Sequence, residues 1–255
     1  MVAVLDALFP PRCAGCGRGS WPFCDSCRAR LRPIAPPWCA RCGRPTERPL
    51  QACALCPPPP VDRARAPLLF RGPARTAIHK LKFAGWRTVA EALAAAMRTM
   101  VDGEHDAVCW VPSSRARRAR RGYDQAGALA DRLARLLEMP TCPAIRRVAD
   151  PGPQARRGGA ERRAAMRGAF AVVGSTPDRV LLVDDVLTTG ATAGACAEVL
   201  AASGVREIVL ITAVRAIPGR LPARYTRRDG ARPGLWLPGE QIPGSRCQPR
   251  AKRPT

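Results

Sequence analysis

The sequence predicts an α/β protein in which helices flank a parallel sheet and a small cysteine-rich module precedes the sheet. Eight cysteines form four Cys-x-x-Cys pairs before residue 57. Between residues 61 and 216, short apolar runs alternate with amphipathic segments, as strands and crossover helices do in parallel sheets. Residues 217–255 are rich in Pro, Gly and Arg without periodicity, which is typical of a disordered basic tail. We therefore expect three parts, residues 1–60, 61–216 and 217–255.

The cysteine pairs in residues 1–60 have the spacing of metal ligands. Pairs one and three are each followed by glycine, in CAGCG and CARCG, which is the zinc-knuckle pattern. The simplest sets give one Zn²⁺ to Cys13, Cys16, Cys24 and Cys27 and a second to Cys39, Cys42, Cys53 and Cys56. A cross-braced pairing of one with three and two with four stays open, as does an iron–sulfur cluster. Four thiolates leave no position for water, so we expect one or two structural zinc ions.

Hydrophobic spacing defines the elements of the larger part. Apolar residues three and four apart predict helices over Ala74–Phe83, Thr88–Met100 and Gln125–Leu137. The apolar run Ala107–Val111 predicts a short strand that Pro112 ends. The polar, glycine-containing stretch Val148–Gly168 is interpreted as a long loop or flap. A second continuous apolar run, Glu207–Val214, is typical of a strand buried on both faces.

The stretch VLLVDDVLTTGAT, residues 180–192, joins an expected strand to an expected helix. Val180–Val183 predicts a central strand, and Asp184 and Asp185 follow at its carboxyl end, where open α/β sheets bind ligands. A tight loop over Leu187–Thr192 then leads into a helix that ends near Ser203. Backbone N–H groups, threonine hydroxyls and the helix N-terminus suit a monophosphate there, and the carboxylates suit hydroxyl groups or hydrated Mg²⁺.

This stretch closely resembles the signature of type I phosphoribosyltransferases, which bind phosphoribosyl pyrophosphate. The resemblance implies that fold, and it implies that the loop after Val183 holds the 5′-phosphate. The implied phosphate ligands are Thr188, Thr189, Gly190, Ala191 and Thr192. It also implies that Asp184 and Asp185, the candidate catalytic residues, bond the ribose hydroxyls while Mg²⁺ bridges the pyrophosphate and ribose oxygens.

The wider layout looks like the ComF family, which is linked to natural competence and to incoming single-stranded DNA. The resemblance rests on the cysteine module, HKLKF (79–83), RRGYDQA (120–126), Gln154, Arg162 and GAF (168–170). Two positions depart from the family pattern. Asp124 stands where the family has an amide, and Ala165 stands where an asparagine normally follows Arg162. Both departures concern base or pyrophosphate contacts rather than the phosphate loop.

Basic residues surround the expected site, and the formal net charge is +22. A coding bias toward arginine and a polyanionic partner both explain this charge. The stretch Arg115–Arg121, interpreted as a loop, holds five arginines, of which Arg118 and Arg121 are candidates for the pyrophosphate. Lys80 and Lys82 cannot share one helical face, so at most one of them reaches the site, and Lys82 is the candidate. Further arginines, Arg156, Arg157, Arg162 and Arg163, lie in the expected flap.

The leading hypothesis is a phosphoribosyltransferase-like protein that binds phosphoribosyl pyrophosphate and Mg²⁺ and transfers a pentosyl group by displacement at ribose C1. The alternative is a single-stranded DNA-binding accessory protein of competence, whose sugar-phosphate site is regulatory or vestigial. Trp21, Phe23 and Trp38 beside the cysteines are then the candidate stacking platforms. DNA-uptake or recombination proteins are expected partners. No stretch predicts a membrane span, and the N-terminus lacks a signal-peptide pattern, so we expect a cytoplasmic protein.

Overall fold

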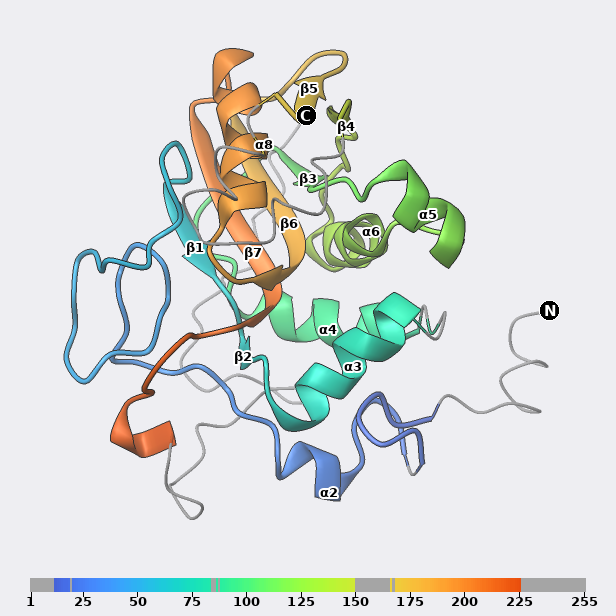
Figure 1. Ribbon diagram of the computed structural model, residues 1–255, viewed down its shortest axis with the longest axis vertical. Coiled ribbons are helices and arrows are strands. Elements are labelled where there is room, and N and C mark those ends of the chain that lie inside the picture. The colour runs from blue at the N-terminus through green and yellow to red at the C-terminus, as the bar shows by residue number, and fades with distance from the viewer. Residues whose placement is uncertain are drawn as a thin grey trace, which may run out of the picture.

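The computed structural model describes residues 12–18, 20–83, 86, 88–149, 166 and 168–225. A parallel sheet of five strands lies at its centre (Figure 1). The strands are β1 Arg63–Arg65, β2 Leu68–Leu69, β3 Ala107–Trp110, β6 Arg179–Leu187 and β7 Glu207–Arg215. β6 and β7 are central: β1 and β2 both pair with β7, and β3 pairs with β6. This confirms the expected parallel α/β architecture.

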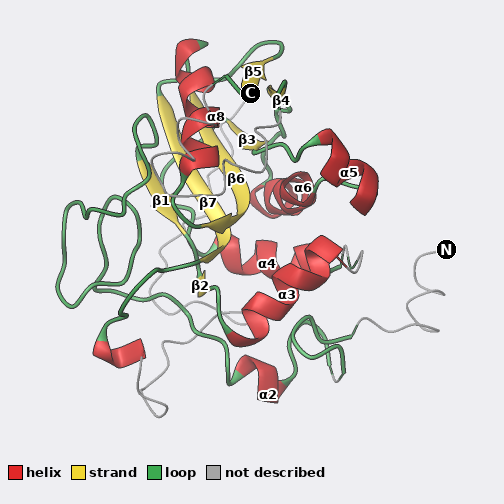
Figure 2. Cartoon of the chain, viewed as in Figure 1, coloured by secondary structure: helices red, strands yellow, loops and turns green. Residues whose placement is uncertain are grey.

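Helices cover both faces of the sheet (Figure 2). The helices are α2 Asp25–Arg28, α3 Gly72–Phe83, α4 Val89–Arg98, α5 Arg115–Arg121, α6 Gln125–Leu137 and α8 Ala191–Ala202, with the 3-10 turn η2 at Ala223–Tyr225. Alternate residues of β6 point to opposite faces. Leu181 and Val183 pack with α3, α4 and α6, whereas Val180 and Leu182 pack with α8. These residues belong to two hydrophobic clusters, one with α3, α4 and α6 and one with α8, and the two clusters therefore lie on opposite faces of the sheet.

The central strand is longer than the sequence predicts. Its pairing with β7 continues past the two aspartates to Leu187, which lies opposite Arg215. The turn before α8 is therefore shortened to residues 188–190, with Gly190 as the N-cap. Sequence reasoning ended the strand at the first acidic residue, because it could not see that β7 continues to offer hydrogen-bonding groups there.

The arginine-rich stretch 115–121 is helix α5 rather than a loop. Ser114 caps its start, since its Oγ accepts a hydrogen bond from the Arg117 N–H at 3.3 Å. Gly122 ends the helix in the left-handed region at φ 77°. The short strands β1 and β2 and the antiparallel pair of β4 (Ile145–Arg147) and β5 (Phe170–Val172) were also missed. Strands of two or three residues leave no periodic pattern to detect.

The two cysteine clusters pack on opposite faces of the sheet. Cys13 and Cys27 lie in the hydrophobic cluster that contains α3, and Cys39 and Cys42 lie in the cluster that contains α8. Lys80 joins the first module to α3, because its Nζ donates to the carbonyl oxygens of Cys13 at 3.2 Å and Gly15 at 3.0 Å. Both modules are thus attached to the α/β part by specific contacts.

Residues 217–225, which we expected in a disordered tail, are anchored instead. Leu221 is buried, and the hydroxyl of Tyr225 accepts a hydrogen bond from the Ala35 N–H at 2.8 Å. Arg224 donates to the Pro37 carbonyl at 2.6 Å. The segment is therefore held by the chain that leads into the second cysteine cluster, a partner that sequence spacing cannot reveal. Residues 226–255 lie outside the described part. No helix in the described residues has the length and apolar character of a membrane span.

Candidate functional site

Each cysteine module gathers four sulfur atoms around one point. In both sets the four sulfurs lie within 4.8 Å of one another. Individual separations are 3.7 Å for Cys16–Cys24, 3.6 Å for Cys39–Cys56 and 3.5 Å for Cys42–Cys53. A tetrahedral zinc ion with Zn–S bonds of about 2.3 Å requires S–S separations of about 3.8 Å. The donor set and its geometry thus fit two structural Zn²⁺ ions.

The pairing of the cysteines follows from these sets. Pairs one and two form the first site, and pairs three and four form the second. The cross-braced alternative, which joins pairs one with three and two with four, is therefore wrong. The two sets stand on opposite faces of the sheet, so sulfurs from both cannot reach one ion.

A buried arginine connects the second zinc site to the sheet. Arg215, the last residue of β7, is 2% exposed. Its guanidinium donates to the carbonyl oxygen of Cys42 and to that of Leu55, the latter at 3.3 Å, and lies 3.4 Å from the Cys42 sulfur. A buried guanidinium is stable only when its N–H groups find acceptors. The second cysteine module supplies those acceptors, so its fold and the end of β7 depend on each other.

The chain that leaves the second module packs against the turn before α8. A Cβ added to Gly190 would lie 2.8 Å from Pro57 Cβ, and a Cβ added to Gly194 would lie 2.6 Å from Pro58 Cγ. Real Cβ atoms do not approach other atoms this closely, so both positions require glycine. The expected phosphate-binding turn and the start of α8 are thus packed closely against the proline segment 57–58.

The turn itself joins β6 to the N-terminus of α8. Gly190 has φ 73°, a left-handed conformation that other residues adopt at a cost. The Thr189 hydroxyl accepts a hydrogen bond from the Ala191 N–H at 3.4 Å, Thr188 is exposed and Thr192 is partly exposed. The first N–H groups of a helix have no intrahelical acceptor. The turn therefore offers donors and a positive helix end of the kind that bind a phosphate group.

The two aspartates lie just before this turn, within β6. Val183, the last fully buried residue before them, pairs with β3 and β7. Lys82 on α3 approaches Asp185, with Nζ 2.8 Å from the carboxylate oxygen. The Asp185 side chain is 13% exposed, so this ion pair is largely shielded from water. Of the two lysines considered, Lys82 points toward the acids and Lys80 supports the first zinc module.

The pKa of Asp184 is raised to about 8. The largest cause is burial, the neighbouring Asp185 carboxylate adds to the rise, and Lys82 opposes it. One oxygen of Asp184 also accepts the Asp185 N–H at 2.8 Å. At neutral pH the unliganded pair therefore holds a proton, and a cation or hydroxyl donor arriving at the site would compete with that proton.

We expect this proton to make stability depend on pH. A carboxyl whose folded pKa, about 8, exceeds its ordinary value of 3.8 stabilises the fold at low pH, and that contribution is lost progressively as pH rises from 3.8 to about 8. The melting temperature of the zinc-loaded protein should thus fall relative to that of Asp184→Asn as pH rises from about 6 to about 8, and the difference should level off above pH 8. A constant difference between the two proteins over that range would contradict the raised pKa.

Arg121 lines a small cavity together with Lys82, the partner of Asp185, and Arg118 is not among the residues that line it. The guanidinium of Arg121 donates to Gln125 Oε1 at 2.5 Å, and its buried Nε has no hydrogen-bond partner among the described residues. Burial lowers the pKa of Arg121, and the Asp185 carboxylate acts against that shift. Arg118 is exposed on α5. Arg121 is therefore the better placed of the two to meet an anion at the aspartates.

The side chains of the RGYDQ motif (residues 121–125) hold α3, α5 and α6 together next to the site, a structural role that the sequence does not predict. Asp124 caps α6 and accepts the Ser113 N–H at 2.8 Å, so its carboxylate has a structural task where the family pattern has an amide. Tyr123 donates its hydroxyl hydrogen to the Leu81 carbonyl, which links the turn before α6 to α3. Gln125 holds Arg121, as described above. The expected flap residues Gln154, Arg156, Arg157, Arg162, Arg163 and Ala165 lie outside the described residues.

Comparisons with known proteins match both parts of the chain. Residues 4–57 match the family described as "Double zinc ribbon domain". The chain is 31% identical over 221 residues to "Competence protein F" of Haemophilus influenzae, covering 80% of this chain and 90% of that protein. It is 29% identical over 202 residues to "DNA utilization protein YhgH" of Escherichia coli O157:H7, covering 74% and 88%. The solved structure of TT1426 from Thermus thermophilus matches 54% of this chain and 86% of its own at 20% identity, with a TM-score of 0.31, too low to define a shared fold.

Proposed function

Since the chain belongs to the ComF family of competence proteins, we propose that it binds phosphoribosyl pyrophosphate with Mg²⁺ and acts in the uptake or use of incoming DNA. The names of both relatives support the second half of this proposal. The first half is supported by one observation: two aspartates, a glycine-capped turn and two basic side chains meet at one end of β6. That combination offers a site for a sugar that carries phosphate at one end.

Each residue has a role in this proposal. The turn from Thr188 to Thr192 binds the 5′-phosphate through backbone N–H groups and hydroxyls, and Asp184 and Asp185 accept hydrogen bonds from the ribose hydroxyls. Lys82 and Arg121 stand beside the carboxylates, where they would meet the pyrophosphate. Mg²⁺ would enter with the substrate and offset the negative charge of the pyrophosphate.

The reaction that such a site supports is transfer of the phosphoribosyl group. The bond between ribose C1 and the pyrophosphate oxygen breaks, pyrophosphate leaves with the electron pair, and a nucleophile forms a new bond to C1. Positive charge develops on the ribose in the transition state. The carboxylates and the anion-binding groups act by positioning and electrostatic stabilisation, so the chemistry requires no strong base.

Titration calorimetry of the zinc-loaded protein with phosphoribosyl pyrophosphate and Mg²⁺ tests the proposal. We expect saturable heat, and an affinity about 10- to 100-fold lower for Asp185→Asn, because a hydrogen bond to a charged group contributes roughly 1.5–3 kcal/mol. Asp178→Asn is the matched control, since Asp178 is an exposed residue just before the opposite end of β6, and its carboxylate lies 3.7 Å from Arg206. Absence of binding by the wild-type protein, or equal affinities for the two variants, would reject this site.

A second function, binding of single-stranded DNA, is favoured by helix α5. All residues 115–120 of this helix are exposed, and the helix RARRARR contains no acidic residue. Such a helix attracts a polyanion through its phosphates, with an affinity that falls steeply as salt rises. Residues 115–120 have no role in the proposed sugar-phosphate site, so one protein can perform both functions.

A further inference from the structure

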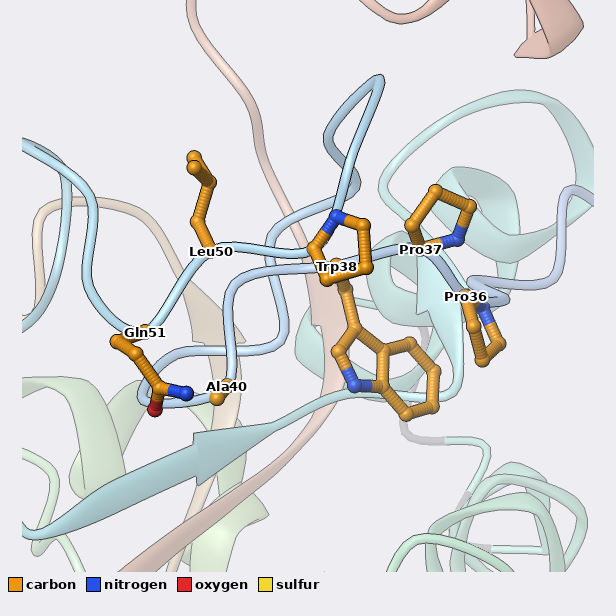
Figure 3. Close-up of a pocket in the computed structure, with 7 residues that line it drawn as sticks. Pro36, Pro37, Trp38, Ala40, Leu50 and Gln51 are labelled. Carbon is orange, nitrogen blue, oxygen red and sulfur yellow. The ribbon is translucent and has the colours of Figure 1, made fainter.

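The aromatic residues beside the cysteines are poor stacking platforms. Phe23 is 5% exposed and belongs to the core, and Trp21 is partly buried against the same hydrophobic cluster. Trp38 lines a shallow groove with Pro36, Pro37 and Leu50 (Figure 3), and the guanidinium of Arg65 lies 5.8 Å from the centre of its ring. None of these three rings is exposed: Phe23 is buried, and Trp21 and Trp38 are partly buried. A surface on which bases could stack must therefore be sought elsewhere.

Phe83, at the end of α3, is the most exposed large apolar residue in the described part of the chain, at 61%. It ends a row of three rings. Phe70 and His79 are stacked, with centroids 6.3 Å apart and planes 12° apart, and His79 and Phe83 follow at 5.8 Å with a tilt of 44°. His79 and Phe83 are four residues apart on a helix, so they lie on one face. We call Phe70, His79 and Phe83 the ring strip.

Arginines flank the ring strip at both ends. Arg75 lies 5.9 Å from the centre of the Phe70 ring, and Arg121 and Arg120 lie 5.0 and 6.0 Å from that of Phe83. Neither α3 nor α5 contains an acidic residue. A row of rings with arginines at both ends, beside two helices that carry no carboxylate, suits a strand that offers both bases and phosphates.

The ring strip also adjoins the aspartate site. A small cavity is lined by Lys82, Phe83, Arg120 and Arg121. Two of these side chains belong to the proposed sugar-phosphate site. Lys82 is paired with Asp185, and the negative charge of that carboxylate acts to raise the pKa of Arg121. A strand bound on the strip would therefore bring a nucleotide close to the end of β6.

We propose that the ring strip and helix α5 together bind single-stranded DNA, with bases stacked on Phe83 and its neighbours and phosphates on the arginines of α5. The proposal rests on the second proposed function and names its surface. Charge complementarity selects this occupant, because five arginines in seven residues suit a polyanion and the exposed rings suit its bases. In duplex DNA the base faces are already stacked on one another, so they are not free to stack on the rings.

Fluorescence anisotropy of a labelled oligothymidylate tests this surface on the full, zinc-loaded chain. We expect Phe83→Ala to weaken binding roughly 5- to 150-fold, which is the range for loss of one base-stacking contact. Phe83→Tyr should retain affinity, because it keeps a flat ring. Leu136→Ala is the matched control, since Leu136 is an exposed apolar residue, at 40%, on the separate helix α6. Arg120→Ala should reduce the slope of log affinity against log salt by about one.

An abasic strand of the same length separates stacking from charge. It should bind the wild-type protein as weakly as oligothymidylate binds Phe83→Ala, and it should not respond to that substitution. If oligothymidylate binds but Phe83→Ala and the abasic strand change nothing, the ring strip is rejected while DNA binding through charge stands. If heparin or an acidic protein displaces oligothymidylate, and the abasic strand binds as tightly as oligothymidylate, the surface binds polyanions in general and the stacking proposal is rejected. If no single strand binds even at low salt, both the strip and the second function are rejected.

Discussion

Loss of zinc from the second cysteine site should abolish binding of phosphoribosyl pyrophosphate, although no cysteine touches the proposed ligand. Structural zinc contributes about 10–16 kcal/mol to the folding of zinc-finger peptides, which is comparable to the whole stability of a domain. Without the metal, the segment that supplies Arg215 with acceptors would unfold, and a buried guanidinium would lose its partners. The contact of Pro57 with Gly190 would be lost at the same time.

Cys53→Ser tests this coupling, because Cys53 is a ligand of the second site and is not bonded to Arg215. We expect the variant to hold one zinc fewer, to melt at a lower temperature and to bind the ligand at least about 100-fold more weakly. Cys16→Ser is the matched control in the first site, where Cys16 is exposed and belongs to the module that packs with α3 rather than with α8. A Cys53→Ser protein that has lost one zinc and binds with unchanged affinity would show that the turn does not depend on the ribbon.

Gly190→Ala is expected to damage the turn directly. Alanine at φ 73° costs about 1–2 kcal/mol, and its Cβ would stand 2.8 Å from Pro57 Cβ and 3.2 Å from Pro57 Cα. Because backbone atoms at this contact cannot rotate aside, the turn and the proline segment must separate. We expect ligand affinity to fall more than tenfold and the melting temperature to fall by several degrees.

Gly174→Ala provides the comparison for Gly190→Ala. Gly174 has φ 78°, nearly the same conformation, but an added Cβ there meets nothing within 4 Å. Both variants carry the same conformational cost, so the difference between them measures the contact with Pro57. Equal losses of stability and of affinity in the two variants would mean that this contact contributes nothing to the turn.

Much of this architecture could be predicted because the relevant signals are local. Cys-x-x-Cys spacing identifies the ligands, the apolar run before Asp184 identifies the central strand although not its end, and the small residues after Gly190 identify the helix. The parallel sheet and the limits of α6 follow from periodicity alone. For α5 the local signal was present, in Ser114 and Gly122, but the run of arginines concealed it.

The contacts that position the site could not be predicted, because their partners are distant in sequence. Arg215 lies 173 residues from Cys42, and Tyr123 lies 42 residues from Leu81. Periodicity shows that a residue is buried, but not which carbonyl accepts its hydrogen bond. The pairing of Lys82 with Asp185 is similar: the sequence offered Lys82 as the candidate, but only the packing of α3 against the sheet shows that its partner is Asp185.

The central claim is that the turn after β6 binds the 5′-phosphate while Asp184 and Asp185 hold the ribose hydroxyls. A crystal structure of the zinc-loaded protein grown with phosphoribosyl pyrophosphate and Mg²⁺ tests it most directly. We predict density for a phosphate within hydrogen-bond distance of the N–H groups at 188–192, with the ribose hydroxyls on the two carboxylates. Density for the ligand elsewhere on the protein, or a saturated crystal whose turn holds no phosphate, would contradict the claim.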